Sequence, residues 1–250
     1  MKIATWNLER ALPGTPKADR QQQWIDRINA DIWVLTETHG GIAPGGNYRS
    51  ISSGLPDRPA EEGERWVQIW VRDRDITPVP TADAARTACG LIALDSEHGC
   101  LIYGTILPWL DSDWRTYPAA NGEAFTAALG VQQADWIQLQ ITHPNATLVV
   151  AGDFNQDLNV LPYYGSRRTK QALRQALLEA NLECLTFGDN DPVRRLINSQ
   201  HSNIDHICMP HRFGLQIQST FAWPDSLEDL RGLSDHFGVG LEVNWSEISG

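Results

Sequence analysis

An acid and an amide lie two residues apart, directly after a short apolar run, in the segment Thr147–Asp157 (T-L-V-V-A-G-D-F-N-Q-D). The run Leu148–Val150 is typical of a buried strand, and Gly152 allows a tight turn after it. Side chains two apart in an extended chain point to the same side, so Asp153 and Asn155 can face one small volume. There the carboxylate could hold a hard cation or take a proton from water, and the amide could donate to a developing oxyanion. An Asx turn that ends the strand would satisfy the same pattern, so both interpretations stay open.

Further polar residues stand beside other apolar runs in the same way. Loops at strand ends are where catalytic groups tend to lie, and oxygen ligands without cysteine favour Mg²⁺ or Mn²⁺ over zinc. A zinc site built from His39, His201, His206 and His236 is conceivable, but no pair has the spacing of a metalloprotease. The complete polar set at the strand ends is Asn7, Glu37, Asp153, Asn155, Asp205, Asp235 and His236.

These residues require strands and helices that bring them together. Hydrophobic periodicity predicts helices over residues 18–29 and 123–140, and a third that begins after Ser166 or Thr169. It predicts strands over residues 3–8, 32–35, 48–51, 66–72, 89–94, 100–107, 148–150, 204–209 and 237–243. No linker or repeat is visible, so we expect one domain over residues 1–250. Trp66, Trp70 and Arg72 alternate with apolar residues and could form a stacking platform for bases, although a strand covered on both sides is favoured.

The composition of the chain limits the kinds of partner that it can bind. A formal net charge of −11 excludes a long basic face, leaving at most local patches for nucleic acid. Two arginine pairs, Arg167–Arg168 and Arg194–Arg195, could hold substrate phosphate or be solvated loop charges. The four cysteines lack C-x-x-C spacing and are expected to be buried free thiols in a reducing cytoplasm. No apolar run is long enough to span a membrane, and no protein partner is implied.

Five segments together resemble a known superfamily. T-W-N at Asn7, T-E at Glu37, G-D-F-N at Asp153, I-D-H-I at Asp205 and L-S-D-H-F at His236 are similar, in order and approximate spacing, to the endonuclease/exonuclease/phosphatase superfamily, which has the DNase I-like fold. The similarity spans nearly the whole chain. In many members a T-H-L segment places a histidine near the end of the middle strand, where this chain has Ile106. The segment 104–108 therefore looks more like the exonuclease III and abasic-endonuclease branch.

The resemblance implies an α/β fold, a four-layer sandwich of two mostly antiparallel sheets flanked by helices. It also implies a Mg²⁺ (or Mn²⁺) site, with Glu37 as ligand and Asn7 beside it. Asp153 would orient or deprotonate the attacking water, and Asn155 would hold phosphoryl oxygens. Asp205 would be a second acid near the metal or the catalytic water.

The resemblance assigns the remaining roles to the end of the chain and to the middle loop. His236, polarised by Asp235, would contact the scissile phosphate and stabilise the charged transition state. Tyr117 is the candidate for protonating the leaving group, since the branch with this middle strand uses a tyrosine farther on.

We therefore expect a divalent-metal-dependent phosphodiesterase or nuclease that hydrolyses nucleic acid or nucleotide-like diesters. The alternatives are a phosphatase for a small phosphorylated metabolite or lipid headgroup, favoured by the acidic composition, and a non-catalytic binding module on the same fold. A steep loss of binding with salt would indicate many phosphate contacts, and a flat response a small ligand.

Overall fold

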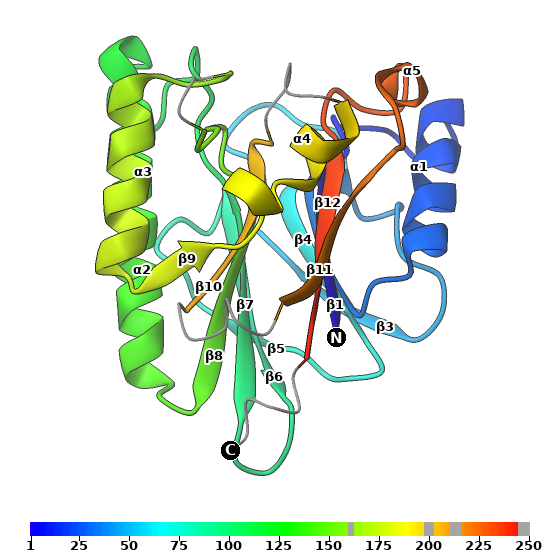
Figure 1. Ribbon diagram of the computed structural model, residues 1–250, viewed down its shortest axis with the longest axis horizontal. Helices are drawn as coiled ribbons and strands as arrows, with labels where there is room; N and C mark the ends of the chain where they lie inside the picture. The colour runs from blue at the N-terminus through cyan, green and yellow to red at the C-terminus, as the bar shows by residue number, and fades with distance from the viewer. Residues whose placement is uncertain (160–162, 198–202, 211–216, 245–250) are drawn as a thin grey trace.

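The computed structural model describes residues 1–159, 163–197, 203–210 and 217–244, which form two six-stranded sheets with helices outside them (Figure 1). The first sheet has the order β11 (Ile217–Trp223), β12 (Gly238–Val243), β1 (Lys2–Asn7), β2 (Ile32–His39), β4 (Glu64–Arg72) and β3 (Tyr48–Ser52). The second has the order β5 (Thr77–Val79), β6 (Thr87–Ala93), β7 (Gly99–Ile106), β8 (Ala146–Asp153), β10 (Asp205–Pro210) and β9 (Leu182–Cys184). Only the pairs β1–β2 and β7–β8 are parallel among the described strands. The predicted sandwich of two mostly antiparallel sheets is confirmed.

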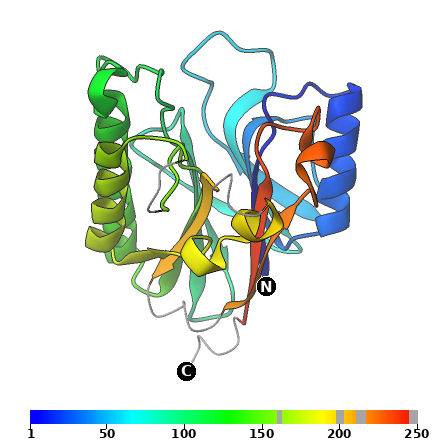
Figure 2. The same ribbon diagram turned by 45° about the horizontal axis from the view of Figure 1, so that its top comes forward.

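Helices cover the outer face of each sheet, as Figure 2 shows with α1 on one flank and the α2–α3 pair on the other. Ile25 of α1 packs with Trp6 and Trp33 of the first sheet. On the second sheet, Trp136 of α2 and Leu173 of α3 join one apolar core. A separate core fills the space between the sheets and is built from branched side chains of both. The helices are α1 (Pro16–Ile28), α2 (Glu123–Thr142), α3 (Arg167–Glu179) and the short α4 (Pro192–Ile197) and α5 (Leu227–Leu230), with 3₁₀ turns at Ala120–Gly122 and Gly188–Asn190.

Local sequence explains where the two long amphipathic helices begin. The Thr15 side chain accepts a hydrogen bond from Ala18 N at 3.3 Å, and Pro16 occupies the first turn of α1, where a missing N–H costs nothing. Ser166 and Thr169 form a reciprocal capping box at the start of α3. Of the two predicted caps for this helix, Ser166 is the N-cap.

The aromatic alternation on β4 is a covered strand. Trp66 is 1% exposed and lies between the guanidinium groups of Arg58 and Arg86, at 4.7 and 5.2 Å from its ring centroid. Trp70 is half-buried against the core beneath α1. The proposed base-stacking platform on this strand is therefore wrong for Trp66, because no ring face is left open to solvent.

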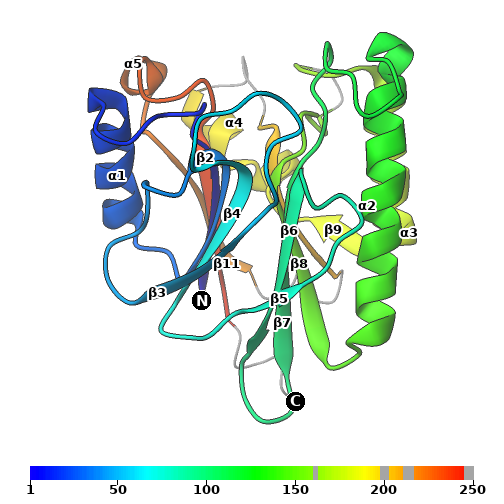
Figure 3. The ribbon, with the colours of Figure 1, turned by 180° about the vertical axis from the view of Figure 1, so that it is seen from behind.

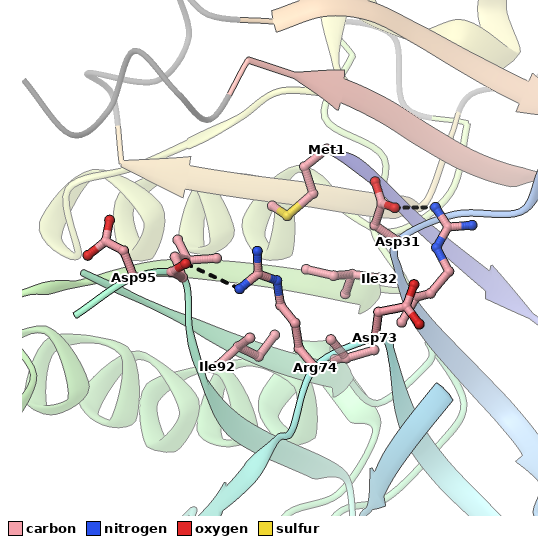
Figure 4. Close-up of a pocket in the computed structure, with 10 residues that line it drawn as sticks. Met1, Asp31, Ile32, Asp73, Arg74, Ile92 and Asp95 are labelled. Atoms are coloured by element: carbon pink, nitrogen blue, oxygen red, sulfur yellow. Dashed lines mark hydrogen bonds and ion pairs between the residues drawn. The ribbon is translucent and has the colours of Figure 1, made fainter. Parts of the chain in front are cut away.

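The two ends of the sandwich differ in chemistry. β1 and β2 run parallel and carry Asn7 and Glu37 toward the end that is uppermost in Figure 1. The opposite end, where β1 begins, holds a cavity of about 420 Å³ lined by Met1, Asp31 and Arg74 among others (Figure 4). The cations of that cavity are already engaged: Arg72 pairs with Asp31, and Arg74 donates to Ala93 O at 2.9 Å. The polar residues at the strand ends therefore place the candidate site at the upper rim.

Candidate active site

Four strand ends from both sheets meet at the upper rim. β1 contributes Asn7 and β2 contributes Glu37, while in the second sheet the register pairs Asp153 at the end of β8 with Asp205 at the start of β10. β1 contacts both β8 and β10, which brings the first sheet's polar groups onto those of the second. The structure thus gathers residues from positions 7, 37, 153 and 205 at one edge.

Asn7 joins the two sheets through its amide. Its Nδ2 donates to Glu37 Oε1 at 3.2 Å and to Asp153 Oδ2 at 3.0 Å, and its Oδ1 accepts from Glu9 N at 2.8 Å. The side chain is buried, so these partners replace the water it loses on folding. Asn7 consequently fixes the separation of the two carboxylates.

The backbone around the acids adopts unusual conformations. Glu37 has φ of 43° and Asn155 has φ of 48°, both in the left-handed region that few residues other than glycine adopt. Such conformations cluster at functional sites, where the surrounding structure enforces them. Gly152 has φ of 140°, and a Cβ there would lie 2.0 Å from Thr105 O of the neighbouring strand. The glycine of G-D-F-N is required by this close approach of β7.

Asp153 is nearly surrounded by donors. Its Oδ1 accepts from Asn155 N at 2.8 Å, and its Oδ2 accepts from Asn155 Nδ2 and from Asn7 Nδ2, each at 3.0 Å. Asn155 Nδ2 also donates to Leu107 O at 2.9 Å. The Asx turn that the sequence left open is present, and it forms part of the same acid cluster rather than an alternative to it.

His236 is held by Asp205. Its Nδ1 donates to Asp205 Oδ2 at 2.6 Å, whereas Asp235 Oδ1 lies 3.8 Å from Nε2 and the Asp235 side chain is 65% exposed. The backbone also positions the ring, because His236 N donates to Ser234 Oγ, which in turn donates to Asn7 O at 2.7 Å. The orienting carboxylate expected at Asp235 is therefore at Asp205 in the structure. Asp235 and His236 lie in the bend before β12 and both line the pocket at the rim, but only Asp205 lies within hydrogen-bond distance of the ring.

The charges at the rim shift the titration of their neighbours. Burial, with the charges of Asp205 and Glu37, raises the pKa of Asp153 to about 7, against the opposing effect of His236. The carboxylates of Asp205 and Asp153 raise the pKa of His236 to about 10, although burial alone would lower it. Near neutral pH the histidine is an imidazolium and Asp153 is poised to gain or lose a proton.

The donor set fits a hard divalent cation. Asp153 and Asp205 each offer a carboxylate oxygen, and these atoms lie within 4.8 Å of each other and of a ring nitrogen of His236, which as an imidazolium would not be a ligand itself. Asp205 Oδ1 is buried and has no hydrogen-bond partner, so this oxygen has a lone pair left for a cation. Oxygen ligands dominate, which favours Mg²⁺ or Mn²⁺ over a softer ion. Glu37 and Asn7 lie on the other side of Asp153, so they could hold a cation from the first sheet.

A pocket of about 260 Å³ opens beside His236. Its walls include Tyr163 and Tyr164, which precede the arginine pair Arg167–Arg168 in the sequence. Their backbone amides donate to Asp157 Oδ2, at 2.5 and 2.8 Å, and Asp157 is itself paired with the buried Lys170. The remaining lining residues are Val193, Asn203, Ile204, Asp205, Leu230, Asp235, His236 and Phe237.

Arg10 is a further residue that the sequence did not single out. Its Nε lies 3.1 Å from Glu37 Oε2, and its backbone N donates to Glu37 O at 2.9 Å. No motif marks it, because the contact depends on the left-handed backbone at Glu9 and Arg10. A guanidinium here partly neutralises the acid that the first sheet brings to the rim.

The predicted phosphate-binding arginines fall into two kinds. Arg167 and Arg168 are exposed at the first turn of α3, directly after the tyrosines of the pocket. Arg194 is exposed on α4, whereas Arg195 donates to Thr220 O at 2.8 Å and is tied to β11. The side chains of Arg167, Arg168 and Arg194 thus have no partner within the described part of the chain. They are the better candidates for a substrate contact.

The other predicted polar residues lie apart from the acid cluster. Tyr117 is 46% exposed and stacks on Trp114, with ring centroids 5.9 Å apart. The His39 ring is hydrogen-bonded to the backbone at Gly41 and Glu62, and His206 Nε2 contacts Gln156 O. His201 lies outside the described residues. Within the described ranges, the zinc site of four histidines is not assembled.

The protein is thus a sandwich of two packed β-sheets flanked by helices, with acids and a histidine gathered at one rim. The chain belongs to the Endonuclease/Exonuclease/phosphatase family, which matches residues 4–236. By this membership it is a phosphoester hydrolase of the nuclease and phosphatase type. No curated protein matches the chain significantly by sequence. Within the part of the chain that the structure describes, no helix has the length and apolar character to cross a membrane.

Solved structures of several nucleic-acid enzymes share the fold. The AP endonuclease LMAP from Leishmania major has a TM-score of 0.68 at 11% identity, with 96% of this chain and 86% of that one covered. The endonuclease domain of TRAS1, a telomere-specific non-LTR retrotransposon, has a TM-score of 0.61 at 15% identity and 97% coverage of both chains. The 3'-5' exonuclease NExo from Neisseria meningitidis has a TM-score of 0.60 at 19% identity, with 98% and 100% covered. At these identities the similarity establishes the fold alone.

Proposed function

We propose that residues 1–250 form one catalytic domain, a divalent-metal-dependent phosphodiesterase that hydrolyses nucleic acid or nucleotide-like diesters. The observation that carries the proposal is the ring of His236, whose Nδ1 lies 2.6 Å from Asp205 Oδ2 and which is close to the buried Asp153. In-line attack on a phosphate gathers negative charge on oxygen, and a fixed cation beside a general base is what that reaction needs. Similar folds in an AP endonuclease and a 3'-5' exonuclease support the choice of nucleic acid and the exonuclease III branch.

Each residue at the rim has a distinct proposed role. Asp153, with its pKa near 7, accepts the proton of the attacking water. His236 donates to a non-bridging phosphate oxygen through Nε2, while Asp205 keeps Nδ1 protonated. Asn155 orients Asp153, and to hold a phosphoryl oxygen its Nδ2 would exchange one of its present acceptors, Leu107 O or Asp153 Oδ2, for that oxygen.

The cation would be held by Glu37 with Asn7, and by Asp205 as a second acid. When bound it supplies Lewis-acid stabilisation of the phosphate charge. Asp235 is exposed at the mouth of the pocket, where it adds negative charge near Nε2 of His236. Tyr117 is the proposed hydroxyl donor to the leaving group; its ring is held by stacking on Trp114.

The test of this proposal is Mg²⁺-stimulated cleavage of a DNA oligonucleotide by the wild type and by Glu37→Gln. The variant keeps the volume of the side chain but removes its charge, so we expect hydrolysis at limiting Mg²⁺ to fall about 10²-fold. Glu9→Gln is the matched control, because Glu9 is an acid in the loop after β1 that pairs with Lys17 at 2.6 Å. Unchanged cleavage by Glu37→Gln, with a folded circular dichroism spectrum, would exclude the proposal.

A phosphatase acting on a small phosphorylated metabolite is the second candidate. The net charge of −11 and a pocket of only about 260 Å³ favour it. Absence of Mg²⁺-dependent turnover on nucleic acid, nucleotide and phospholipid substrates would instead favour a non-catalytic binding module.

We also propose the cytoplasmic location that the sequence predicts. The four cysteines are free thiols in the structure.

The arginines at the start of α3 separate the two catalytic candidates. If Arg167, Arg168 and Arg194 contact a polynucleotide backbone, the double variant R167A/R168A should weaken binding of single-stranded DNA. The slope of the logarithm of the binding constant against the logarithm of the salt concentration should also fall by the amount expected for about two phosphate contacts. Arg49→Ala is the control, since this exposed arginine lies on the edge strand β3 beside Asp75. Binding measured by fluorescence anisotropy across a salt series distinguishes the cases. A flat salt response shared by all variants would point to the small-molecule phosphatase.

A further inference from the structure

Two of the four cysteines lie directly opposite each other on neighbouring strands. The register of β9 and β10 pairs Cys184 with Cys208, and both thiols are free. At the next position along the ladder, Leu185 N donates to Ile207 O at 2.8 Å. Hydrogen-bonded and non-hydrogen-bonded pairs alternate in an antiparallel ladder, so Cys184 and Cys208 form a non-hydrogen-bonded pair.

That position has the geometry of a cross-strand disulfide. Residues in a non-hydrogen-bonded pair have Cα atoms roughly 4.5 Å apart and side chains closer than in the other pair type. Disulfides span Cα separations of about 4.4 to 6.8 Å, so the separation typical of this pair type lies within the range that a disulfide bridges. Both side chains point to the helix side of the sheet, where Cys208 belongs to the apolar core and Cys184 packs against it.

The other two cysteines lack this relationship. Cys89 belongs to the core beneath the helices, whereas Cys100 belongs to the core between the sheets, so the second sheet lies between their sulfur atoms. Burial raises the pKa of Cys89 to about 12 and raises that of Cys100 further, which keeps both as unreactive thiols. The chain therefore contains one matched pair and two isolated thiols.

Cys184 is also the cysteine that small molecules can reach. It is half-buried and lines an open cavity of about 430 Å³, together with Leu158, Arg174 and Phe187. Figures 1 and 3 both show β9 at the edge of the second sheet, beside the helices and away from the first sheet. Cys208, one strand further in, is fully buried. An oxidant entering through this cavity meets Cys184 first.

We propose that Cys184 and Cys208 form a reversible thiol–disulfide site that is oxidised by hydroperoxides. In the first step the Cys184 thiolate attacks the peroxide, the O–O bond breaks, and Cys184 becomes a sulfenic acid as the peroxide leaves as an alkoxide or hydroxide. In the second step the sulfur of Cys208 attacks Cys184, an S–S bond forms, and the sulfenic oxygen leaves as water with the thiol proton of Cys208. Two electrons pass from the two sulfur atoms to the peroxide oxygen, and a dithiol reverses the reaction.

The surroundings of Cys184 support its role as the attacking thiol. Burial would raise its pKa, but the hydrogen bond from Cys208, together with the charge and the hydrogen bond of the buried His206, outweighs this effect and lowers the pKa below its ordinary value. Thr186 Oγ1 lies 3.9 Å from Cys184 Sγ and is a further polar neighbour. Cys208 keeps its proton until the second step, because burial raises its pKa.

The experiment exposes the full, reduced chain to hydrogen peroxide and counts thiols after denaturation. We expect the count to fall from four to two, to return to four with dithiothreitol, and peptide mapping to find one disulfide between Cys184 and Cys208. Cys89→Ala, the control, should still lose two thiols. Cys208→Ala should form no intramolecular disulfide and should accumulate a Cys184 sulfenic acid that a dimedone probe captures.

Each contrary result overturns the proposal. These results are a count that stays at four, a disulfide that includes Cys89 or Cys100, or cross-linking between two chains in place of a bond within one. Mapping of the wild-type chain gives the answer even if a variant fails to fold. Because no step depends on phosphoester hydrolysis, the outcome is independent of the proposed catalytic function.

Discussion

Asp153→Asn is expected to lower kcat for phosphodiester hydrolysis by about 10²- to 10⁴-fold, the contribution typical of a positioned general base. The substitution removes the proton acceptor while keeping the shape of the side chain. It also disturbs the local hydrogen bonds, because Asp153 Oδ2 accepts from the amides of both Asn7 and Asn155 at 3.0 Å. The NH₂ group of asparagine would face a donor in either orientation, because Asp153 Oδ1 also accepts, from Asn155 N at 2.8 Å.

Single-turnover cleavage at saturating Mg²⁺ measures this effect apart from product release. Asp189→Asn is the control, because Asp189 lies exposed in the 3₁₀ turn Gly188–Asn190. Thermal unfolding of both variants checks that the fold is retained. Wild-type kcat in a folded Asp153→Asn variant would remove Asp153 from the chemistry, and another residue at the rim would have to accept the proton.

The strand ends of this chain could be predicted because apolar runs and polar termini alternate in the sequence. Val149 and Val150 predict the buried strand β8, and the G-D-F-N that follows predicts both the turn and the acid. The same logic located Asn7 and Glu37, since Asn7 is the last residue of β1 and Glu37 lies near the end of β2, after its apolar run. Predicting that these residues gather at one rim also required the superfamily resemblance, because periodicity does not give the order of the strands.

Edge strands were missed for physical reasons. β5 contains Pro78 and β9 has only three residues, so neither presents an alternating pattern. β11 pairs with β12 alone, and most of its side chains are exposed or half-buried, so no strong apolar face marks it. Their absence from the prediction also hid the Cys184–Cys208 pair, whose meeting depends on the register of β9.

Long-range side-chain pairing could not be predicted from neighbours in the sequence. Asp235 adjoins His236 in the chain, but the histidine ring is hydrogen-bonded to Asp205, which is 31 residues distant in the sequence. Lys170 comes soon after the pair Arg167–Arg168 in the sequence, yet it is buried and paired with Asp157 at 3.1 Å. Buried lysines are rare without such a partner, and nothing local in the sequence indicates one.

Asp205→Asn provides the sharpest test of the histidine, because it should change the pH profile as well as the rate. The pKa of His236 is raised to about 10 chiefly by Asp205, with Asp153 assisting, and removing the Asp205 charge lowers that pKa. The wild-type kcat/KM should rise as Asp153 loses its proton near pH 7 and fall as His236 loses its proton near pH 10. In the variant the falling limb should move to lower pH, while the rising limb also moves down because a like charge beside Asp153 is gone.

His236→Ala completes the comparison. It removes the imidazolium from the phosphate, so we expect a loss of about 10²- to 10³-fold in kcat and the disappearance of the alkaline limb. His39→Ala is the matched control, since that imidazole is bonded to the backbone of its own loop. The two apparent pKa values belong to the coupled acids and histidine together, so the movement of each limb between variants carries the assignment rather than its absolute position. An alkaline limb that survives in His236→Ala would show that another group titrates there, and the proposed pairing of imidazolium with phosphate would then be wrong.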